Sequence, residues 1–583
     1  MKRLISSALA LLLLLTLFSC ASEGDSGITT ETTTEDTAMP SDSATTSDAP
    51  PAEEDSLTLF EDGKSEYTIV RPDGAKESYE TAAAISFNEK FKVLTGKTLP
   101  VTTDWKDNPV KEKEVLIGVT SREINSSKVD RSLLGYGGYI LAVIDNRLIL
   151  TANDKAGLDA AVKYFFSLYD IHKGLDTIKV SKELFIIVEK AEIKAGSLPF
   201  RAMWLSQFDL SPVYGSSSGQ ADEATFRKNI TRVLDNCKSI GINNVIVQVR
   251  PNADSMYPSE YYAPSSYVVG SYGNDFAYDP FAIIVKEAHD RGLLVHAWIN
   301  PMRAMKTSEI VKLDQKYTVR KWWDDETLRA KYLPTVNSQV YLNVGYPEVR
   351  QLILDGAAEI LTKYPVDGLH MDDYFYPTKD ASFDSSAFSE YGNGKSLADW
   401  RRANINTLVA GLYSISKADG KNVTFGISPA GNIDNVYNSQ YADIYTWCAN
   451  KGYIDYICPQ IYFGFEHKTC AFDKTADKWS SIIKEDSVSL IIGMTLGKAV
   501  SGAQGTEDKY AGTGSKEWIE NKDVLLRCLI RATETDKCTG VAYFCYQYFW
   551  NPTTGAENSY TKAERANLLP CLAEIAKADE GKK

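Results

Sequence analysis

From about Leu198 onward, the pattern of apolar and polar positions switches repeatedly between two periods. Short strand-like runs are separated by longer stretches in which apolar residues recur every three or four positions, as in amphipathic helices. The strand-like runs lie near residues 201–206, 244–250, 293–300, 368–373, 424–429, 454–462, 489–496 and 540–548. The clearest helices are expected at 223–240, 280–291, 347–364, 399–417 and 518–534. Eight strand–helix repeats in series predict an α/β fold, a (β/α)8 TIM barrel over residues 196–580. An open doubly wound sheet would need a Gly-rich phosphate-binding turn after an early strand, and the sequence has none.

Residues 57–195 show a different alternation and predict a small α+β domain. Helical spacing is expected over 79–94 and again over 156–169, with a strand at 114–118 between them. Two further strands flank the turn dipeptide Asp145-Asn146. This order is similar to that of the domain preceding the barrel in some hexosaminidases and α-glucuronidases. It contains no catalytic constellation, so we interpret it as an accessory module.

The first 56 residues are typical of an exported, tethered protein. Lys2 and Arg3 precede an apolar run from Ala8 to Phe18, which is too short to span a bilayer and resembles a secretory signal. The run ends at Ser19-Cys20, which resembles a bacterial lipoprotein box, so we expect residues 1–20 to be a signal peptide and Cys20 to be lipidated. Residues 21–56 are rich in Ser, Thr and acidic residues and predict a disordered linker. The predicted localisation is the cell envelope, with the lipid as the membrane anchor.

Charge and cysteine content narrow the choice of partners. The formal net charge of the 583-residue chain is −14, and ten acidic residues fall between Ala21 and Ser56. A mildly acidic body without a basic stripe argues against nucleic acid as a partner. The eight cysteines after Cys20 show no metal-ligand spacing such as C-x-x-C, so buried thiols are expected.

Strand alternation predicts which side chains line the barrel. The set facing the surrounding helices must be apolar, so the other set faces the axis. This rule directs polar and aromatic residues inward at the strand ends, where barrel enzymes place their sites. The inward set comprises Trp204, Ser206, Gln248, Arg250, His296, Trp298, Asn300, Gly368, His370, Asp372, Ser428, Cys458, Gln460 and Tyr462. Flat apolar faces mixed with directed hydrogen-bonding groups suit a sugar, which has an apolar C–H face and a rim of hydroxyls.

Several segments of the barrel region resemble the glycosyl hydrolase-like 10 family, formerly domain of unknown function 187. They run through most of the barrel in order: 248–260 (QVRPNADSMYPSE), 287–289 (EAH), 296–303 (HAWINPMR), 367–377 (DGLHMDDYFYP), 399–402 (DWRR), 427–429 (ISP) and 455–462 (DYICPQIY). The resemblance implies a TIM-barrel glycosidase of bacterial envelopes, with members that act on cell-wall glycan.

Glycoside cleavage generally needs two carboxyl groups, one of which protonates the leaving oxygen. Asp372 is our first candidate because it ends the fourth strand and points inward. Asp373 is our second candidate, because strand alternation turns it away from the barrel axis unless the strand has already ended before it. The segment also resembles the D-G-x-D-x-D-x-E run of family 18 chitinases, but His370 replaces the second Asp and Tyr374 the catalytic Glu. The partner carboxyl is therefore expected on a loop, and the candidates are Asp254, Glu466 and Glu260.

The remaining inward residues are expected to bind the substrate. Gln248, Arg250, Asn252, His296, Asn300, His370, Ser428, Gln460 and Tyr462 would hold hydroxyl, carboxylate or acetamido groups, and Trp298 would stack beneath the ring. Pairing of Arg250 with Asp254 or Asp372 is an alternative.

Three functional hypotheses remain open. The first is a lipid-anchored glycoside hydrolase that uses carboxylate acid/base catalysis without a cofactor. The second is a carbohydrate-binding lipoprotein without catalytic activity. The third is metal-assisted hydrolysis or deacetylation with His296, His370 and Asp372 as ligands. The expected partner is polysaccharide or peptidoglycan glycan in each of the first two.

Overall fold

The structure is a computed structural model that describes residues 56–73, 78–122, 129–131, 134, 137–169, 174–188, 198–216 and 219–580. The predicted signal peptide with Cys20, nearly all of the predicted linker, and the predicted domain boundary at 195/196 lie outside these residues. Every helix in the described part of the chain is too short or too polar to span a bilayer.

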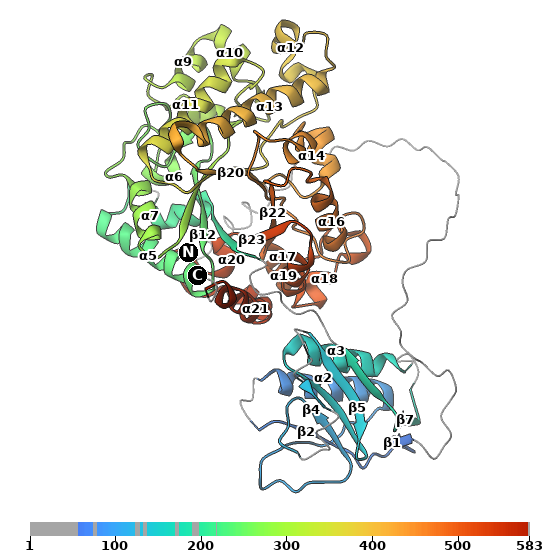
Figure 1. Cartoon of the computed structure of the whole chain (residues 1–583). Helices are drawn as coiled ribbons and strands as arrows, with labels where there is room; N and C mark the ends of the chain where they lie inside the picture. Colours follow the sequence, from blue (N-terminus) through green and yellow to red (C-terminus); the bar gives the residue numbers. More distant parts are fainter. Residues whose placement is uncertain are drawn as a thin grey trace, which may run out of the picture. The chain divides into compact units, whose positions relative to one another are not determined.

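The region that precedes the barrel has a mixed six-stranded sheet with two helices packed on one face (Figure 1). The strand order is β3-β2-β4-β6-β5-β8, and a separate antiparallel pair joins β1 and β7. The elements are β1 (Ser56–Glu61), β2 (Thr68–Arg71), α2 (Tyr79–Thr95), β3 (Val101–Thr103), β4 (Glu114–Ile117), β5 (Tyr139–Ile144), β6 (Arg147–Ala152), α3 (Lys155–Ser167), β7 (Thr177–Ser181) and β8 (Phe185–Val188). The predicted α+β class of this region is confirmed.

Local sequence signals explain these elements. Ser78 caps the start of α2 by accepting from the backbone N–H of Thr81, and Gly96 ends the helix at φ 71°. The buried face of α2 places Phe87 against Phe165 of α3, with ring centroids 5.4 Å apart. Asp145 and Asn146 both adopt positive φ, as a two-residue hairpin turn requires.

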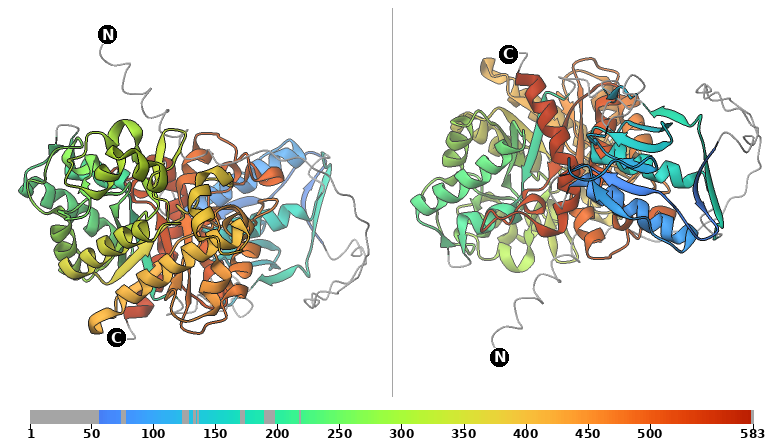
Figure 2. Two further views of the ribbon diagram at one scale, coloured as in Figure 1. Left: turned by 90° about the horizontal axis from the view of Figure 1, so that it is seen from above. Right: turned by 90° about the horizontal axis from the view of Figure 1, so that it is seen from below.

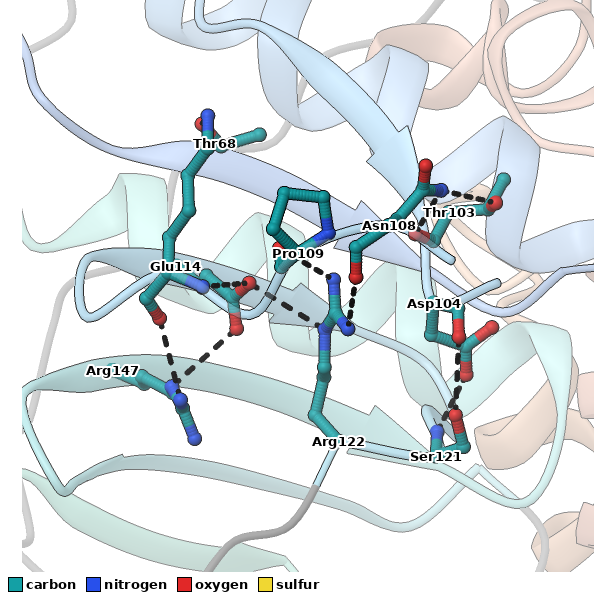
Figure 3. A network of polar contacts seen from close by, with 10 residues as sticks. Thr68, Thr103, Asp104, Asn108, Pro109, Glu114, Ser121, Arg122 and Arg147 are labelled. Atoms are coloured by element: carbon teal, nitrogen blue, oxygen red, sulfur yellow. Dashed lines mark hydrogen bonds and ion pairs between the residues drawn. The ribbon is translucent and has the colours of Figure 1, made fainter. Parts of the chain in front are cut away.

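A buried carboxylate ties the first residue of β4 to two arginines (Figure 3). The side chain of Glu114 is 1% exposed, and its two oxygens lie 3.5 Å from Arg122 Nε and 3.4 Å from Arg147 Nε. The arginines also donate to backbone carbonyls, Arg122 to those of Asn108 and Pro109. Because a buried charge is tolerated only when it is paired, this cluster fixes the loops around β4 and is structural.

The second region is a closed barrel of eight parallel strands, as predicted. Its order is β12-β15-β19-β20-β21-β22-β23-β9, so each strand pairs with the next along the chain and the last pairs with the first. The strands are β9 (Phe200–Leu205), β12 (Asn244–Arg250), β15 (Leu294–Ile299), β19 (Gly368–Met371), β20 (Thr424–Ile427), β21 (Tyr456–Ile457), β22 (Ser489–Thr495) and β23 (Cys538–Phe544). All eight overlap the predicted runs, but all except β9 and β12 are shorter than predicted, β21 most of all.

Helices surround the strands, as the further views in Figure 2 show. The principal ones are α5 (Glu223–Ser239), α7 (Pro280–His289), α11 (Pro347–Lys363), α13 (Leu397–Ser416), α16 (Phe472–Ile482), α19 (Val524–Glu534) and α21 (Lys562–Glu580). Shorter helices lie in the connections: α4 (Gln207–Tyr214), α6 (Ser266–Val269), α8 (Thr307–Ile310), α9 (Thr318–Asp324), α10 (Glu326–Tyr332), α12 (Ser385–Tyr391), α14 (Ile433–Ser439), α15 (Ile444–Ala449), α17 (Gly497–Ala503), α18 (Glu517–Glu520) and α20 (Tyr546–Phe549). The single helix expected at 518–534 is in fact two, because extended backbone at Asn521 ends α18.

Two cores confirm the predicted alternation along the strands. Outward positions such as Val247 and Leu369 join the large core beneath the helices. Inward positions such as Trp204, Trp298 and Cys458 form a separate cluster inside the barrel. The eight cysteines after Cys20 are free thiols, not in disulfide bonds, and seven of them are buried, as expected.

Candidate active site

Asp372 and Asp373 lie together at the carboxyl end of β19. The strand ends at Met371, two residues earlier than predicted, so strict alternation no longer applies to Asp373. Asp372 is 2% exposed, and its carboxylate accepts from Trp298 Nε1 at 3.1 Å and from the Tyr374 backbone N–H at 3.2 Å. The Gln460 side chain acts on Asp373 in the direction that favours its ionised form, which lowers the pKa of that carboxyl group. The early strand end therefore brings both carboxyl groups into the barrel mouth.

Burial makes both carboxyl groups weaker acids than ordinary aspartates. It raises the pKa of Asp372 well above its usual range, and the negative charge of Asp373 raises it further. Burial also raises the pKa of Asp373, to about 6. Because like charges at close range oppose a second ionisation, the pair holds one proton into the weakly acidic range. One carboxylic acid beside one carboxylate is the combination that acid/base cleavage requires.

Below the carboxyl groups, a chain of hydrogen bonds runs through the barrel interior. Trp204 Nε1 and Ser428 Oγ lie 3.3 and 2.9 Å from His370 Nε2, and the Tyr456 hydroxyl bridges His370 Nδ1 at 2.8 Å to His296 Nδ1 at 3.3 Å. Since an indole N–H can only donate, His370 Nε2 accepts and its Nδ1 carries the proton. The tyrosine then donates to His296, whose Nε2 donates to Asn244 Oδ1 at 3.2 Å.

His296 and His370, the two histidines in this series of hydrogen bonds, are neutral. Burial lowers the pKa of His296 to about 4 and that of His370 well below its usual value. Both ring nitrogens of each residue already have partners, and among the described residues no three His, Cys, Asp or Glu side chains could hold a metal ion. The arrangement does not fit the hypothetical metal site of His296, His370 and Asp372. His296, His370 and Ser428 support the site from below.

A second hydrogen-bond relay orients amide groups in the mouth. The Gln207 backbone N–H donates to Gln248 Oε1 at 2.7 Å, and Gln248 Nε2 donates to Asn300 Oδ1 at 3.0 Å. Asn300 Nδ2 is buried and has no hydrogen-bond partner among the residues that the structure describes. Gln248 thus positions Asn300, whose free N–H groups are available to a ligand.

The other inward residues around the pair differ in which of their hydrogen-bonding groups are already engaged. Trp298 is 5% exposed and uses its indole N–H to hold Asp372, so it orients the acid more directly than it could stack against a sugar. Gln460 Nε2 also donates to the Ser428 carbonyl at 3.1 Å. Tyr462 stacks on Phe544 with centroids 5.9 Å apart, and its buried hydroxyl has no partner. Within the described part of the chain, the Tyr462 hydroxyl and Asn300 Nδ2 are two mouth groups without a hydrogen-bond partner, and both could bind sugar hydroxyls.

The prediction that Arg250 points into the mouth is wrong. The register of β12 against β15 shifts between Gln248 and Arg250, so Arg250 pairs with outward-facing Ile299. Its guanidinium carbon lies 4.6 Å from the Tyr262 ring centroid, and a Cβ on Gly356 of α11 would come within 2.4 Å of Nη1. A bulge reverses the facing of the residues that follow it, and Arg250 therefore packs beneath α11. It pairs with neither Asp254 nor Asp372.

The three loop carboxylates proposed as partners are not brought to the pair by any described contact. Asp254 is fully buried, where it accepts from the Tyr272 hydroxyl and from the Asn252 backbone N–H, both at 2.9 Å. It is a loop-fixing group, and Asn252 belongs to the same turn. Glu260 is exposed beside α11, where its backbone N–H donates to Glu359. Glu466 is exposed in the loop after β21, with its backbone N–H bound to Glu517.

Two charged residues at the strand ends were missed by the sequence reasoning. Asp209 accepts hydrogen bonds from Ser206 and, at 2.7 Å, from the Gln547 backbone N–H. These bonds join the end of β9 to the end of β23. Burial raises the pKa of Asp209 to about 6. The S-x-x-D capping pattern at 206–209 could have identified it. Arg303 follows β15, and its guanidinium carbon lies 4.8 Å from the Tyr374 ring centroid. Its position at the end of the HAWINPMR segment was the available signal.

A cavity of about 910 Å³ lies at the opposite, N-terminal end of the barrel. Its lining includes Phe200, Asn244 and Thr424, and it contains neither Asp372 nor Asp373. Residues at this end of a TIM barrel generally serve stability, so we assign the site from the carboxyl groups at the other end.

We expect cleavage of a glycan substrate to have a bell-shaped pH dependence with its maximum on the weakly acidic side of neutrality. Above the pKa of the raised pair the acid loses its proton, and at lower pH the second carboxylate gains one, so the rate falls in both directions. Measurement of kcat/KM across about pH 4 to 9 tests this. A rate that stays constant from pH 5 to 8 would contradict the assignment. The Asp373→Asn variant, with one titrating group left, should lose the two-sided shape.

Comparison with solved structures finds the glycoside hydrolase domain of PgaB (BpsB) from Bordetella bronchiseptica, at 12% identity and a TM-score of 0.40, over 64% of this chain and 99% of that one. A β-N-acetylhexosaminidase from Bacteroides fragilis matches at 14% identity and a TM-score of 0.38, over 89% of this chain and 87% of that one.

Sequence relatives are closer. Glycosyl hydrolase YngK of Bacillus subtilis is 36% identical over 319 residues, which are 51% of this chain and 61% of YngK, so the match spans less than two thirds of that relative. Glycosyl hydrolase DigH of Escherichia coli K12 is 30% identical over 403 residues, 64% of this chain and 89% of DigH. The model of the family described as Glycosyl hydrolase-like 10 matches residues 199–512, which hold seven of the eight barrel strands and both carboxyl groups. The chain is a member of the glycosyl hydrolase-like 10 family.

Proposed function

We propose that this protein is a glycoside hydrolase that cleaves bacterial cell-wall glycan or a related polysaccharide, with Asp372 and Asp373 as its acid/base pair. The observation that carries the proposal is the placement of two adjacent carboxyl groups of raised pKa at the carboxyl end of a barrel strand, where Asp372 is buried and held by Trp298 and Asp373 is partly exposed. The names of the relatives YngK and DigH, both glycosyl hydrolases, agree with this reaction class.

In the proposed reaction, the protonated member of the pair donates to the glycosidic oxygen. The ionised member stabilises positive charge on the sugar or activates water. Trp298 holds the Asp372 carboxyl group in place, and Asn300 and Tyr462 hold substrate hydroxyls. We further propose that Cys20 carries a lipid and that residues 21–56 let the barrel reach glycan near the membrane.

Product analysis tests this function. The intact chain is incubated with peptidoglycan strands lacking peptides, and in parallel with plant and storage polysaccharides, and new reducing ends are measured. We expect shortened glycan from the first substrate, with the activity in the membrane fraction of expressing cells and released to the soluble fraction by Cys20→Ala. No new reducing ends from any glycan would refute the hydrolase proposal.

A further inference from the structure

One tryptophan of the accessory domain presents its side chain to solvent. All ten tryptophans of the chain lie in the described residues, and Trp105, two residues after β3, is the exposed one, at 48%. Val119, in the loop after β4, is also exposed, at 39%. An indole has a large apolar face, which folded proteins ordinarily bury in large part. A single exposed apolar side chain is nevertheless common, so the support of the ring and its place in the sheet decide whether it can bind a ligand.

Hydrogen bonds fix the loop that carries Trp105. The indole Nε1 donates to Asp107 Oδ2 at 3.1 Å, and the Asn108 backbone N–H donates to the Trp105 carbonyl at 2.8 Å. From the other side of the loop, Arg122 donates to the Asn108 carbonyl at 3.2 Å while it pairs with the buried Glu114 (Figure 3). A ring that is already held loses little conformational freedom when a ligand binds, so the loop is preorganised for contact.

Trp105 lies at the end of the sheet where open α/β folds bind ligands. Strand β2 pairs in parallel with β3 on one side and with β4 on the other. The chain runs from β2 through α2 to β3 and then returns to the far side of β2 as β4, so the direction of winding reverses beside β2. The carboxyl ends of strands at such a switch point are the usual place for a ligand.

Asp104, the residue before Trp105, ties together the loops at this switch point. Its carboxylate accepts from the backbone N–H of Asp73, after β2, at 2.6 Å and from that of Ser121, after β4, at 2.5 Å. Figure 3 shows the contact between Asp104 and Ser121. Trp105 is thereby held beside the carboxyl ends of three parallel strands.

The groups around the ring indicate a sugar as the ligand. Lys106 Nζ lies 5.7 Å from the ring centroid, and the side chains of Lys106, Asp107 and Ser121 are all exposed. They surround a flat apolar face with donors and acceptors, which is the combination that a pyranose needs for its C–H face and its hydroxyl rim. The negative charges of Asp73, Asp104 and Asp107 would repel a phosphate backbone.

We propose that Trp105 is the platform of a glycan-binding site in the accessory domain, and that this site takes a chain of β-1,4-linked pyranoses with equatorial substituents. Equatorial substituents leave the C–H face of each sugar flat, so it can stack on the indole, whereas an axial substituent at C4 bends the chain away from the ring. The site does not depend on hydrolysis by the barrel, because neither Asp372 nor Asp373 takes part in it.

Fluorine NMR of the intact protein labelled with 5-fluorotryptophan follows this site directly. Trp105→Phe identifies the resonance of Trp105, and Trp298→Phe identifies that of Trp298, which reports on the barrel mouth. Hexamers of β-1,4-linked glucose and of β-1,4-linked N-acetylglucosamine are titrated beside a β-1,4-linked galactose hexamer, whose C4 substituent is axial. We expect at least one of the first two to shift the Trp105 resonance saturably, with an affinity about tenfold higher than that of the galactose hexamer.

Co-sedimentation with insoluble β-1,4-glucan measures the contribution of the ring. Trp105→Ala should raise the apparent Kd by about tenfold, and Trp105→Tyr should retain part of the affinity. Because Trp105 is exposed, both substitutions should leave the fold intact. The matched control is Phe185→Ala, which removes a 44% exposed aromatic ring from β8 at the opposite edge of the same sheet and should bind like the parent.

The two resonances separate this proposal from the function of the barrel. A shift of Trp105 without one of Trp298 would support the site whether or not the barrel cleaves glycan. A Trp105 resonance that no hexamer moves at millimolar concentration would overturn the site and leave the barrel proposal standing. A shift caused by a proline-rich peptide, with none from any glycan, would also overturn it, since the exposed indole would then be a peptide-binding surface.

Discussion

Replacing Asp372 with Asn is expected to lower kcat/KM for glycan cleavage by about 10²- to 10⁴-fold while glycan binding persists. Asn has nearly the same shape and can still accept from Trp298 Nε1, so the site should keep its geometry. It has no carboxyl proton to give or accept. Reducing-end release and calorimetric titration on the same preparation measure the two quantities.

The matched control for this substitution is Glu260→Gln. Glu260 also follows a barrel strand and was a candidate from the sequence, but it is exposed beside α11, so we expect activity within about twofold of the parent. Asp372→Asn protein that cleaves glycan at the parent rate would remove Asp372 from catalysis. A parent protein that binds glycan but releases no reducing ends would instead favour the second hypothesis, a carbohydrate-binding lipoprotein.

Removing the guanidinium of Arg401 is expected to destabilise the barrel by about 3 to 5 kcal/mol. Arg401 of α13 pairs with Asp384 through two contacts, at 2.6 and 2.9 Å, and neither side chain is exposed. The guanidinium also lies 5.0 Å from the Tyr376 ring and donates to the Asp380 carbonyl at 2.7 Å. Arg401→Met would leave the Asp384 charge buried and unpaired. Urea unfolding followed by tryptophan fluorescence measures the loss.

This ion pair should also affect catalysis, because it holds the loop that begins at Asp372 and Asp373. We expect Arg401→Met to lower kcat on glycan at a temperature where the variant remains folded. Lys286→Met is the control for stability, since Lys286 forms only an exposed, solvent-screened pair with Asp290 and its loss should leave the free energy of unfolding nearly unchanged. Removing both charges with Arg401→Met and Asp384→Leu should recover part of the lost stability, because no unpaired charge remains. A single variant as stable as the parent would contradict the argument.

The barrel and much of its lining could be predicted because strand alternation and helix periodicity are local. Val247 and Leu369 had to face the helices, which directed Gln248 and His370 inward without any knowledge of neighbouring strands. The same rule pointed to Asp372. These inferences held because each depended on a run of consecutive residues whose pattern reports its own surroundings.

Arg250 and Asp373 show where this reasoning stopped. The bulge that turns Arg250 toward Tyr262 and the early end of β19 that admits Asp373 both depend on register with adjacent strands. Loop carboxylates were harder still. Tyr272, whose hydroxyl donates a hydrogen bond to Asp254, lies 18 residues further along the chain, and no sequence periodicity predicts such a contact.

Local sequence patterns were enough to predict the (β/α)8 barrel, most of its inward-facing residues and the position of Asp372 at a strand end, since these follow from the two-residue period of a strand and the apolar packing of helices. The tertiary structure was needed to show that Asp373 lies with Asp372 at the carboxyl end of β19 and that Arg250 packs beneath α11 rather than in the mouth. Partnership between groups depends on the distances between separate strands and loops, which are set when the barrel closes.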